Sequence, residues 1–293
     1  MHNNNSWTDP KDRQFSFDIG PFKDVKKGLC YDLSSGWWHG MPLADAHPPF
    51  GILSYRTPQG QRVQKDIAML HDNKVGFGFI SELMMCTAHS GTHIDALAHV
   101  VCGSDPSWFG DHLAKESLGD FGPIGKDASE LPPIVCRGVL IDVAGYLGVD
   151  HMNKGQAVTI ELLEGALNAQ KTDIKRGDIA FIRTGTMQKW PDKEHLAACH
   201  GSGLALEGAE WLVAKGVRAI GGDNESLECQ PSGYAGDPQP VHRYLIREQG
   251  IPILEWVFLE DLARDSIYSF MFVCLPLSVT GATGSMIRPI AII

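Results

Sequence analysis

The sequence predicts an α/β protein built as one domain, with a mixed β-sheet core and flanking helices. Two observations predict this class. Short apolar runs with β-branched residues recur along the chain, each bounded by Gly, Pro, Asn or Asp, which is typical of strands. Helical patterns lie between several of these runs in the second half, which indicates layered packing of helices on a sheet. The predicted strands lie at 76–88, 138–145, 178–185, 217–223, 251–259 and 268–277.

Three segments between these strands have helix signals. Thr159 is a suitable N-cap for the segment 160–170. The segment 204–216 has an apolar face and ends at Gly216, a suitable C-cap. The segment 239–250 has Pro240 near its start and Gly250 at its end. Residues 1–30 read as an irregular N-terminal arm, and 31–293 as the folded domain.

Composition narrows the classes of partner. The chain has 293 residues and a net charge of -10, with 43% hydrophobic residues. An acidic chain without clustered Lys and Arg argues against binding to nucleic acid or an anionic membrane. We find no signal peptide and no apolar run long enough to span a membrane. The seven cysteines are scattered without a C-x-x-C pair. We therefore expect free thiols and a cytoplasmic protein that acts on a small molecule.

The segment "HSGTHIDALAH" (89–99) carries the strongest chemical signal. On a helix, Asp95 would lie about 200° around from His93, so the polar side chains would not converge. On a strand, His93 and Asp95 point the same way because they are two residues apart. Gly91 would let the backbone bend so that His89 comes round. The spacing thus favours a strand entered through a turn.

Imidazoles and a carboxylate that converge form a site for a divalent metal. Two His and one carboxylate suit Zn, Mn or Fe(II) and leave positions open for water or substrate. The ligands in this interpretation are His89, His93 and Asp95. His99 is either a fourth ligand or a nearby proton acceptor. Burying these polar groups without a shared partner would be costly, which favours a metal site over unrelated core histidines.

Asp223 follows the predicted strand 217–223, where it would either orient a ligand from behind or cap a turn.

The "HSGTHIDALAH" segment closely resembles the signature of the "Putative cyclase" family, which includes kynurenine formamidase (arylformamidase) and isatin hydrolase. Other segments support the resemblance together, over most of residues 31–293: "YDLSSGWWHGMP" (31–42), "RGDIAFIRTG" (176–185), "AIGGDNESLE" (219–228), "VHRYLIREQGIPILEWVFLEDL" (241–262) and "LPLSVTGATGSMIRPIAI" (275–292). The resemblance implies the swivelling β/β/α fold of the cyclases and a homodimer or homotetramer.

The resemblance also implies roles for individual residues. It makes His89, His93 and Asp95 metal ligands and His99 the catalytic acid/base. It places a second metal at His242 and Glu255, and a substrate pocket at Trp37, Trp38 and His39.

Two positions separate the branches of the family. The formamidase branch has Pro where this chain has Leu97, which makes the signature more similar to that of isatin hydrolases. That branch has Gln in place of the late Glu and uses one manganese, whereas this chain has Glu255. Manganese or zinc, and one or two ions per chain, therefore remain alternatives.

The expected function is hydrolysis of an amide-type C–N bond, in an aryl N-formamide or a cyclic amide such as isatin or a lactam, by metal-activated water. Two alternatives stay open: a lactone or imide hydrolase with the same site, and a metal-binding scaffold without catalysis.

Overall fold

The computed structural model describes residues 17, 20, 23 and 25–293. Most of the predicted N-terminal arm (1–30) therefore lies outside the described residues.

A mixed nine-stranded sheet organises the body of the molecule, as the sequence predicts. Its four central strands run parallel, and the strands outside them pair antiparallel. Strands from the two ends of the chain meet at one edge, where β1 pairs with β17. In spatial order the strands are β1 (Cys30–Asp32), β17 (Ile290–Ile292), β15 (Ser269–Cys274), β9 (Ile134–Asp142), β11 (Ile179–Arg183), β13 (Ala219–Gly222), β14 (Ile253–Glu255), β4 (His93–Asp95) and β16 (Gly284–Met286).

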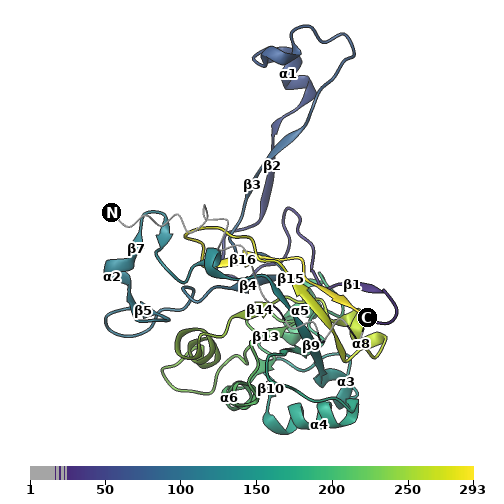
Figure 1. Ribbon diagram of the computed structural model, residues 1–293, viewed down its shortest axis with the longest axis vertical. Coiled ribbons are helices and arrows are strands. Elements are labelled where there is room, and N and C mark those ends of the chain that lie inside the picture. The colour runs from purple at the N-terminus through teal and green to yellow at the C-terminus, as the bar shows by residue number, and fades with distance from the viewer. Residues whose placement is uncertain (1–16, 18–19, 21–22, 24) are drawn as a thin grey trace.

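The sheet is buried on both faces by two hydrophobic cores. Strand residues alternate between them, because successive side chains point to opposite faces: Val139 and Ile141 lie in one core, and Leu140 lies in the other. The first core packs under helices α4 (Ile160–Gln170), α6 (Leu206–Lys215) and η5 (Arg243–Gln249), and the second includes Leu262 of α8 (Glu260–Arg264). Figure 1 shows α4 and α6 beneath the sheet. Burial on both faces explains why these strands read as continuous apolar runs.

The predicted helices are confirmed. α4 begins directly after Thr159, although the Thr159 side chain makes no capping hydrogen bond. α6 ends at Gly216, whose φ of 84° is the left-handed conformation that glycine adopts readily. The third segment forms a short α7 (Pro240–His242) that continues into η5 and ends at Gly250.

Five predicted strand segments supply β9, β11, β13, β14 and β15 of the large sheet. The prediction over 138–145 is displaced, because β9 starts at Ile134 and residues 143–147 form α3 (Val143–Leu147). Asp142 caps this helix by accepting a hydrogen bond from the backbone N–H of Gly145, which ends the strand. Asp223 caps a turn: its carboxylate accepts hydrogen bonds from the backbone N–H groups of Thr184, Gly185 and Thr186.

The sixth predicted strand lies outside the sheet. Only Ser81–Met85 of the segment 76–88 is a strand, β3, which pairs with β2 (Gly51–Arg56) in a separate two-stranded sheet. Between them lie α1 (Pro58–Gln64) and the 3-10 turn η3 (Ala68–Leu70). This projecting hairpin (residues 51–85) extends away from the body (Figure 1).

Short elements complete the described chain: the pairs β5 (Ser107–Trp108) with β6 (His112–Leu113), β7 (Leu118–Gly119) with β8 (Gly122–Pro123), and β10 (Ala157–Val158) with β12 (Gly203–Leu204), and the helices α2 (Ala114–Ser117), η4 (Ala128–Glu130) and α5 (Lys193–Cys199). No helix in the described part of the chain has the length and apolar character needed to cross a bilayer. All seven cysteines are unpaired, and four are buried: Cys136, Cys199, Cys229 and Cys274.

Candidate metal centre

The candidate site forms where β4 pairs antiparallel with β14. The register sets Glu255 directly opposite His93, so both side chains point to the same face of the sheet. Asp95, two residues further along β4, shares that face. All three residues are almost fully buried, at 5% exposure or less.

The turn before β4 brings in His89. Gly91 has a φ of +54°, and a Cβ there would lie 2.6 Å from Oγ of Ser35 and 2.8 Å from Cε of Met41. Only glycine fits this backbone without displacing its neighbours. The turn is also held by Trp37, whose Nε1–H donates to the carbonyl of Ser90 at 2.7 Å. The predicted strand entered through a bend at Gly91 is confirmed.

His93 presents one ring nitrogen to the site. Its Nδ1 lies 2.7 Å from the carbonyl oxygen of Gly91, which can only accept, so Nδ1 carries the proton. The Nε2 of His93 then faces two carboxylates, 3.5 Å from Oδ1 of Asp95 and 3.2 Å from Oε2 of Glu255.

His242 reaches the same place from α7. Its Nδ1 donates to the buried carboxylate of Glu228, which also accepts the backbone N–H groups of Val241 and His242 at 3.2 and 3.1 Å. Its Nε2 lies 3.2 Å from Oε1 of Glu255 and 3.9 Å from Oδ2 of Asp95. Glu228 thus fixes the ring orientation that aims Nε2 inward.

His89 completes the group. Its Nε2 lies 3.0 Å from the hydroxyl of Thr283, and its Nδ1 lies 2.8 Å from Oδ1 of Asp95. When Nε2 donates its proton to Thr283, Nδ1 keeps a lone pair directed at the carboxylates.

The chemistry of these donors fits a divalent cation. Four buried atoms of this cluster make no hydrogen bond of good geometry, although Nδ1 of His89 lies 2.8 Å from Asp95 and Oε1 of Glu255 lies 3.2 Å from His242: they are Nδ1 of His89, both carboxylate oxygens of Asp95 and Oε1 of Glu255. Leaving such atoms unsatisfied costs about 1–3 kcal/mol each, and more for charged groups, whereas a cation satisfies them together. Two sets of ligand atoms lie within 4.8 Å of one another: His89, Asp95 and His99 in one, and His93, Asp95 and Glu255 in the other. Asp95 belongs to both.

The pKa values reflect concentrated negative charge. Burial alone would raise the pKa of Asp95, but His99, His89 and His93 hold it well below its usual range. Burial would lower the pKa of His93, but Asp95 and Glu255 raise it to about 10. The carboxylates are therefore ionised and attract either protons or a metal.

His99 packs against His89 but differs from His93 in the direction of its pKa shift. It follows β4 in a turn closed by its N–H to the carbonyl of Ala96, and its ring centre lies 4.1 Å from that of His89. Burial, together with the neighbouring His89 and His242, lowers the pKa of His99 to about 4, although Asp95 opposes the shift. Its imidazole is therefore neutral at physiological pH and able to accept a proton.

A cavity of about 540 Å³ opens onto the cluster. His47 lies at its wall with its ring stacked on His89, 5.0 Å between centres. The lining also carries an ion pair between His200 and Glu225. Most of the described residues that line it carry polar side chains, and the aromatic rings among them belong to histidines; these residues are Leu43, Ala44, Asp45, Ala46, His47, His89, His99, His200, Glu225, Ser226, Gln230, Gln239, His242 and Glu255.

The substrate-binding role of Trp37, Trp38 and His39 stays a prediction, and the structure shows what these residues contact. Trp37 supports the turn at Ser90, and Trp38 packs edge-on against Trp190 at 5.8 Å between ring centres. His39 is exposed. None of the three belongs to the described lining of the cavity.

Sequence reasoning missed three residues of this site. Glu228 was not assigned a role because nothing in the local sequence marks it as the partner of a histidine 14 positions later. Thr283 and His47 were missed for the same reason, since both come from segments distant from the signature.

A further group of possible ligands lies at His151, His195 and Cys199. The Nε2 of His195 already lies 3.1 Å from the carbonyl oxygen of Gly185 and 3.7 Å from the sulfur of Cys199. Because that nitrogen must carry a proton to bond the carbonyl, we assign this cluster a packing role.

Comparisons with known proteins identify a relative among curated proteins. "Cyclase-like protein 2" of Oryza sativa subsp. japonica is 28% identical over 217 residues, which cover 73% of this chain and 65% of that protein. The chain thus spans less than two thirds of the length of this curated relative.

Two solved structures share the fold. A crystal structure described as a novel cyclase has a TM-score of 0.79 and 25% identity, covering 94% of this chain and 90% of that one. Isatin hydrolase A from Labrenzia aggregata, bound to benzyl benzoate, has a TM-score of 0.66 and 18% identity, covering 90% and 93%. At 18% identity this second likeness shows the fold alone.

The family model described as "Putative cyclase" matches residues 31–229, about two thirds of the 293-residue chain. The match includes the turn at Gly91 and the strand that carries His93 and Asp95. The protein therefore belongs to the "Putative cyclase" family.

Proposed function

We propose that this protein is a metal-dependent hydrolase that opens a cyclic amide with water. The observation that carries the proposal is the convergence of His93, His242 and His89, each held at one ring nitrogen, on unpartnered oxygens of Asp95 and Glu255. This preorganised donor set is typical of a catalytic metal centre, where a partner behind each histidine fixes its orientation.

In the proposed site, His89, His93 and Asp95 hold one divalent ion, and His242 and Glu255 hold a second where one is bound. Manganese and zinc both suit nitrogen and oxygen donors of this kind. The ion supplies Lewis acidity, which acidifies a water molecule and polarises the substrate carbonyl.

The protein's own residues handle the proton. His99, neutral because burial lowers its pKa, accepts a proton from the attacking water as the new C–O bond forms. His99 then gives that proton to the amide nitrogen of the substrate as the C–N bond breaks. One water is consumed, and the product carries an amine and a carboxylic acid, which releases its proton to the solvent and becomes a carboxylate.

The cavity favours a compact substrate with polar edges. Gln230, Gln239 and the His200–Glu225 pair line its wall, where they are placed to pair with carbonyl or N–H groups of a ring. Isatin hydrolase A, whose name denotes hydrolysis of a cyclic amide, shares the fold. Trp37, Trp38 and His39 are not part of this cavity wall. In this proposal they contact an aryl group of the substrate where it extends beyond the wall.

A second candidate is hydrolysis of an imide or lactone in the same site. It is favoured by the amide side chains of Gln230 and Gln239 in the cavity lining, because such rings present two acceptor oxygens. The attack on the carbonyl is the same in both reactions, and only the leaving atom differs.

The test is to strip the purified chain with a chelator, reload it with Mn²⁺ or Zn²⁺, and assay a panel of isatin, N-formylkynurenine, small lactams, imides and lactones. We expect hydrolysis that depends on the metal and is strongest on a cyclic substrate. His93→Ala should lose metal and hydrolysis together, because it removes a ligand from the centre.

The matched control is His112→Ala, which removes an imidazole outside the cluster and should keep both properties. Metal bound at full occupancy by His93→Ala would refute the assignment of the centre. A metal-loaded chain that hydrolyses nothing in the panel would favour a scaffold without catalysis.

A further inference from the structure

A second hollow adjoins the cavity at the metal centre. Its volume is about 560 Å³, and Gln230 and Gln239 belong to the lining of both spaces. A ligand seated in the cavity can therefore extend past these two amide side chains into the second space, which we call the adjoining hollow. Its other described lining residues are Pro231, Ser232, Tyr234, Gly236, Asp237 and Pro238.

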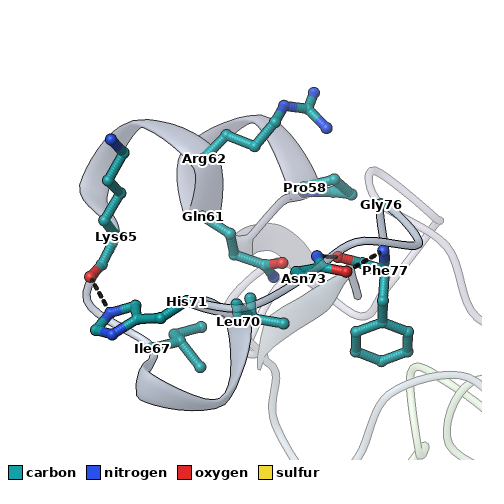
Figure 2. A pocket seen from close by; sticks show the side chains of 10 residues that line it. All are labelled: Pro58, Gln61, Arg62, Lys65, Ile67, Leu70, His71, Asn73, Gly76 and Phe77. Atoms are coloured by element: carbon teal, nitrogen blue, oxygen red, sulfur yellow. Dashed lines mark hydrogen bonds between the residues drawn. The ribbon is translucent and has the colours of Figure 1, made fainter.

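The position of the adjoining hollow distinguishes it from a larger one on the projecting hairpin. Figure 2 shows that larger hollow, of about 660 Å³, between α1 and the returning chain, and its described lining shares no residue with that of the cavity. The hairpin extends away from the strands β4 and β14 that carry the metal centre (Figure 1). A substrate held at the metal centre therefore reaches the adjoining hollow and not the hairpin.

The adjoining hollow is formed by a loop that is tied to the metal centre at both ends. Loop 230–239 begins just after Glu228, which holds the ring of His242, and it ends just before His242 itself. At its start, the N–H of Gln230 donates to the carbonyl of Gly201 at 2.9 Å. A Cβ on Gly201 would lie 2.2 Å from the carbonyl oxygen of Gln230, so the two segments are in close contact. The loop is thus fixed relative to the site that it borders.

Internal hydrogen bonds order the loop around Tyr234. The hydroxyl of Ser232 donates to the carbonyl of Asp237 at 2.7 Å and accepts the N–H of Tyr234 at 3.2 Å. The N–H of Asp237 donates to the carbonyl of Tyr234 at 3.1 Å. Because the backbone on both sides of Tyr234 is already held, a ligand that contacts its ring meets a lower entropy cost of binding.

The surface of the adjoining hollow suits an uncharged aryl group. Tyr234 is 47% exposed, and the exposed Pro231 and Pro238 add apolar surface beside it. The carboxylate of Asp237 is paired with Nε of Arg243 at 2.8 Å, which offsets its charge. Aromatic rings stack favourably on one another. Since the aromatic rings in the described lining of the cavity are imidazoles, Tyr234 offers an aryl group a less polar ring to stack on.

We propose that the adjoining hollow is a subsite for an aryl substituent carried by the ring that the metal centre opens. This inference rests on the proposed function. A compact ring occupies the cavity, Gln230 and Gln239 flank the link to the substituent, and Tyr234 stacks on the aryl group. Contacts remote from the reacting bond orient a substrate, so this subsite would favour aryl-substituted rings over the bare ring.

The experiment compares isatin with 1-phenylisatin and 5-phenylisatin, which carry the same added ring at two different positions. Calorimetry with the metal-loaded full chain gives each dissociation constant, and kcat/KM replaces it for any probe that is hydrolysed. We expect at least one phenyl probe to bind roughly 10-fold more tightly than isatin, because stacking and apolar burial both favour the added ring.

Substitutions at Tyr234 assign this gain to the adjoining hollow. Tyr234→Ala should abolish the gain, whereas Tyr234→Phe should keep it, because the ring remains. The matched control is Tyr146→Ala: Tyr146 is also 47% exposed, but it lies on α3 and outside both described linings, so the gain should persist. Tyr234 belongs to neither hydrophobic core, and thermal melting checks that each variant is folded.

Three results would overturn the proposal. The first is that neither phenyl probe binds more tightly than isatin. The second is a gain that survives Tyr234→Ala, which would instead favour the predicted contacts at Trp37 and Trp38. The third is loss of the gain in Tyr234→Phe, because the hydroxyl rather than the ring would then make the contact.

The same measurements separate this proposal from the proposed function. A gain that depends on Tyr234 in a chain that hydrolyses no probe would support the subsite and contradict the hydrolase assignment. Hydrolysis of isatin without any gain from the phenyl group would support the hydrolase assignment and overturn the subsite.

Discussion

Glu255 lies directly opposite His93 across the β14–β4 pair, and its Oε2 is 3.2 Å from Nε2 of His93. Its other oxygen is 3.2 Å from Nε2 of His242. One carboxylate thus joins two histidines that are separated by about half of the chain. This arrangement places a negative charge between two donor nitrogens, which is where a cation would be held.

Replacing that carboxylate tests its role directly. Glu255→Gln keeps the size of the side chain but removes the charge, so we expect at least a 10-fold loss of affinity for one metal ion. In a chain that binds two ions, the number per chain should fall from two to one. Elemental analysis after dialysis against a weak chelator measures this number. Unchanged occupancy would show that Glu255 is not a ligand.

Glu228 should matter to the metal without touching it. It accepts the Nδ1 proton of His242 and two backbone N–H groups. In Glu228→Gln the uncharged amide holds the ring less firmly, so metal affinity should fall roughly 10- to 100-fold. Competition with a chromophoric chelator gives the dissociation constant. Glu164→Gln, an exposed change on α4, is the control, and equal affinities in both variants would rule out the positioning role.

His99 can be either a base or a ligand, and one substitution separates the two. If it is the acid/base, His99→Ala should keep the metal and lose about 10²- to 10⁴-fold in kcat. The cluster of His99 with His89 and Asp95 would also allow direct ligation. In that case the variant should lose metal as well as activity. Metal content and kcat measured on the same preparation distinguish these outcomes.

The cysteines should differ in reactivity according to their burial. Burial raises the pKa of Cys136 to about 11 and that of Cys274 to about 12, so little of either thiol is ionised at pH 8. The thiolate is the reactive form, and Cys30 is exposed. We expect Cys30 to react faster with a disulfide reagent in the native chain than the half-buried Cys86 and Cys102, and Cys30→Ser to remove this fastest phase; all seven thiols should react in denaturant. Rapid reaction of Cys274 in the native state would contradict the described core.

The sequence by itself determined the elements whose signals are local. Apolar runs located five strands of the sheet, and Gly216 and Gly250 marked helix ends because glycine tolerates the left-handed backbone there. The spacing of His93 and Asp95 predicted a strand, since residues two apart on a strand share a face. Gly91 predicted the bend before it.

Local pattern could not decide whether a strand lies in the core. The segment 76–88 has the composition of a buried strand, yet β3 lies in the projecting hairpin. Apolar composition alone therefore does not decide burial, because most residues of β3 are exposed although they are of the types found in core strands.

Only the tertiary structure decided which distant residues meet at the site. Glu228 contacts Nδ1 of His242, and Thr283 contacts Nε2 of His89. These contacts form because strands from separate parts of the chain share one sheet. The cavity wall likewise combines residues from loops that are far apart in the sequence. The fold brings these loops together by fixing the strands and helices at their ends. Spacing along the chain encodes which side chains share a face, whereas long-range pairing of strands determines which faces come together.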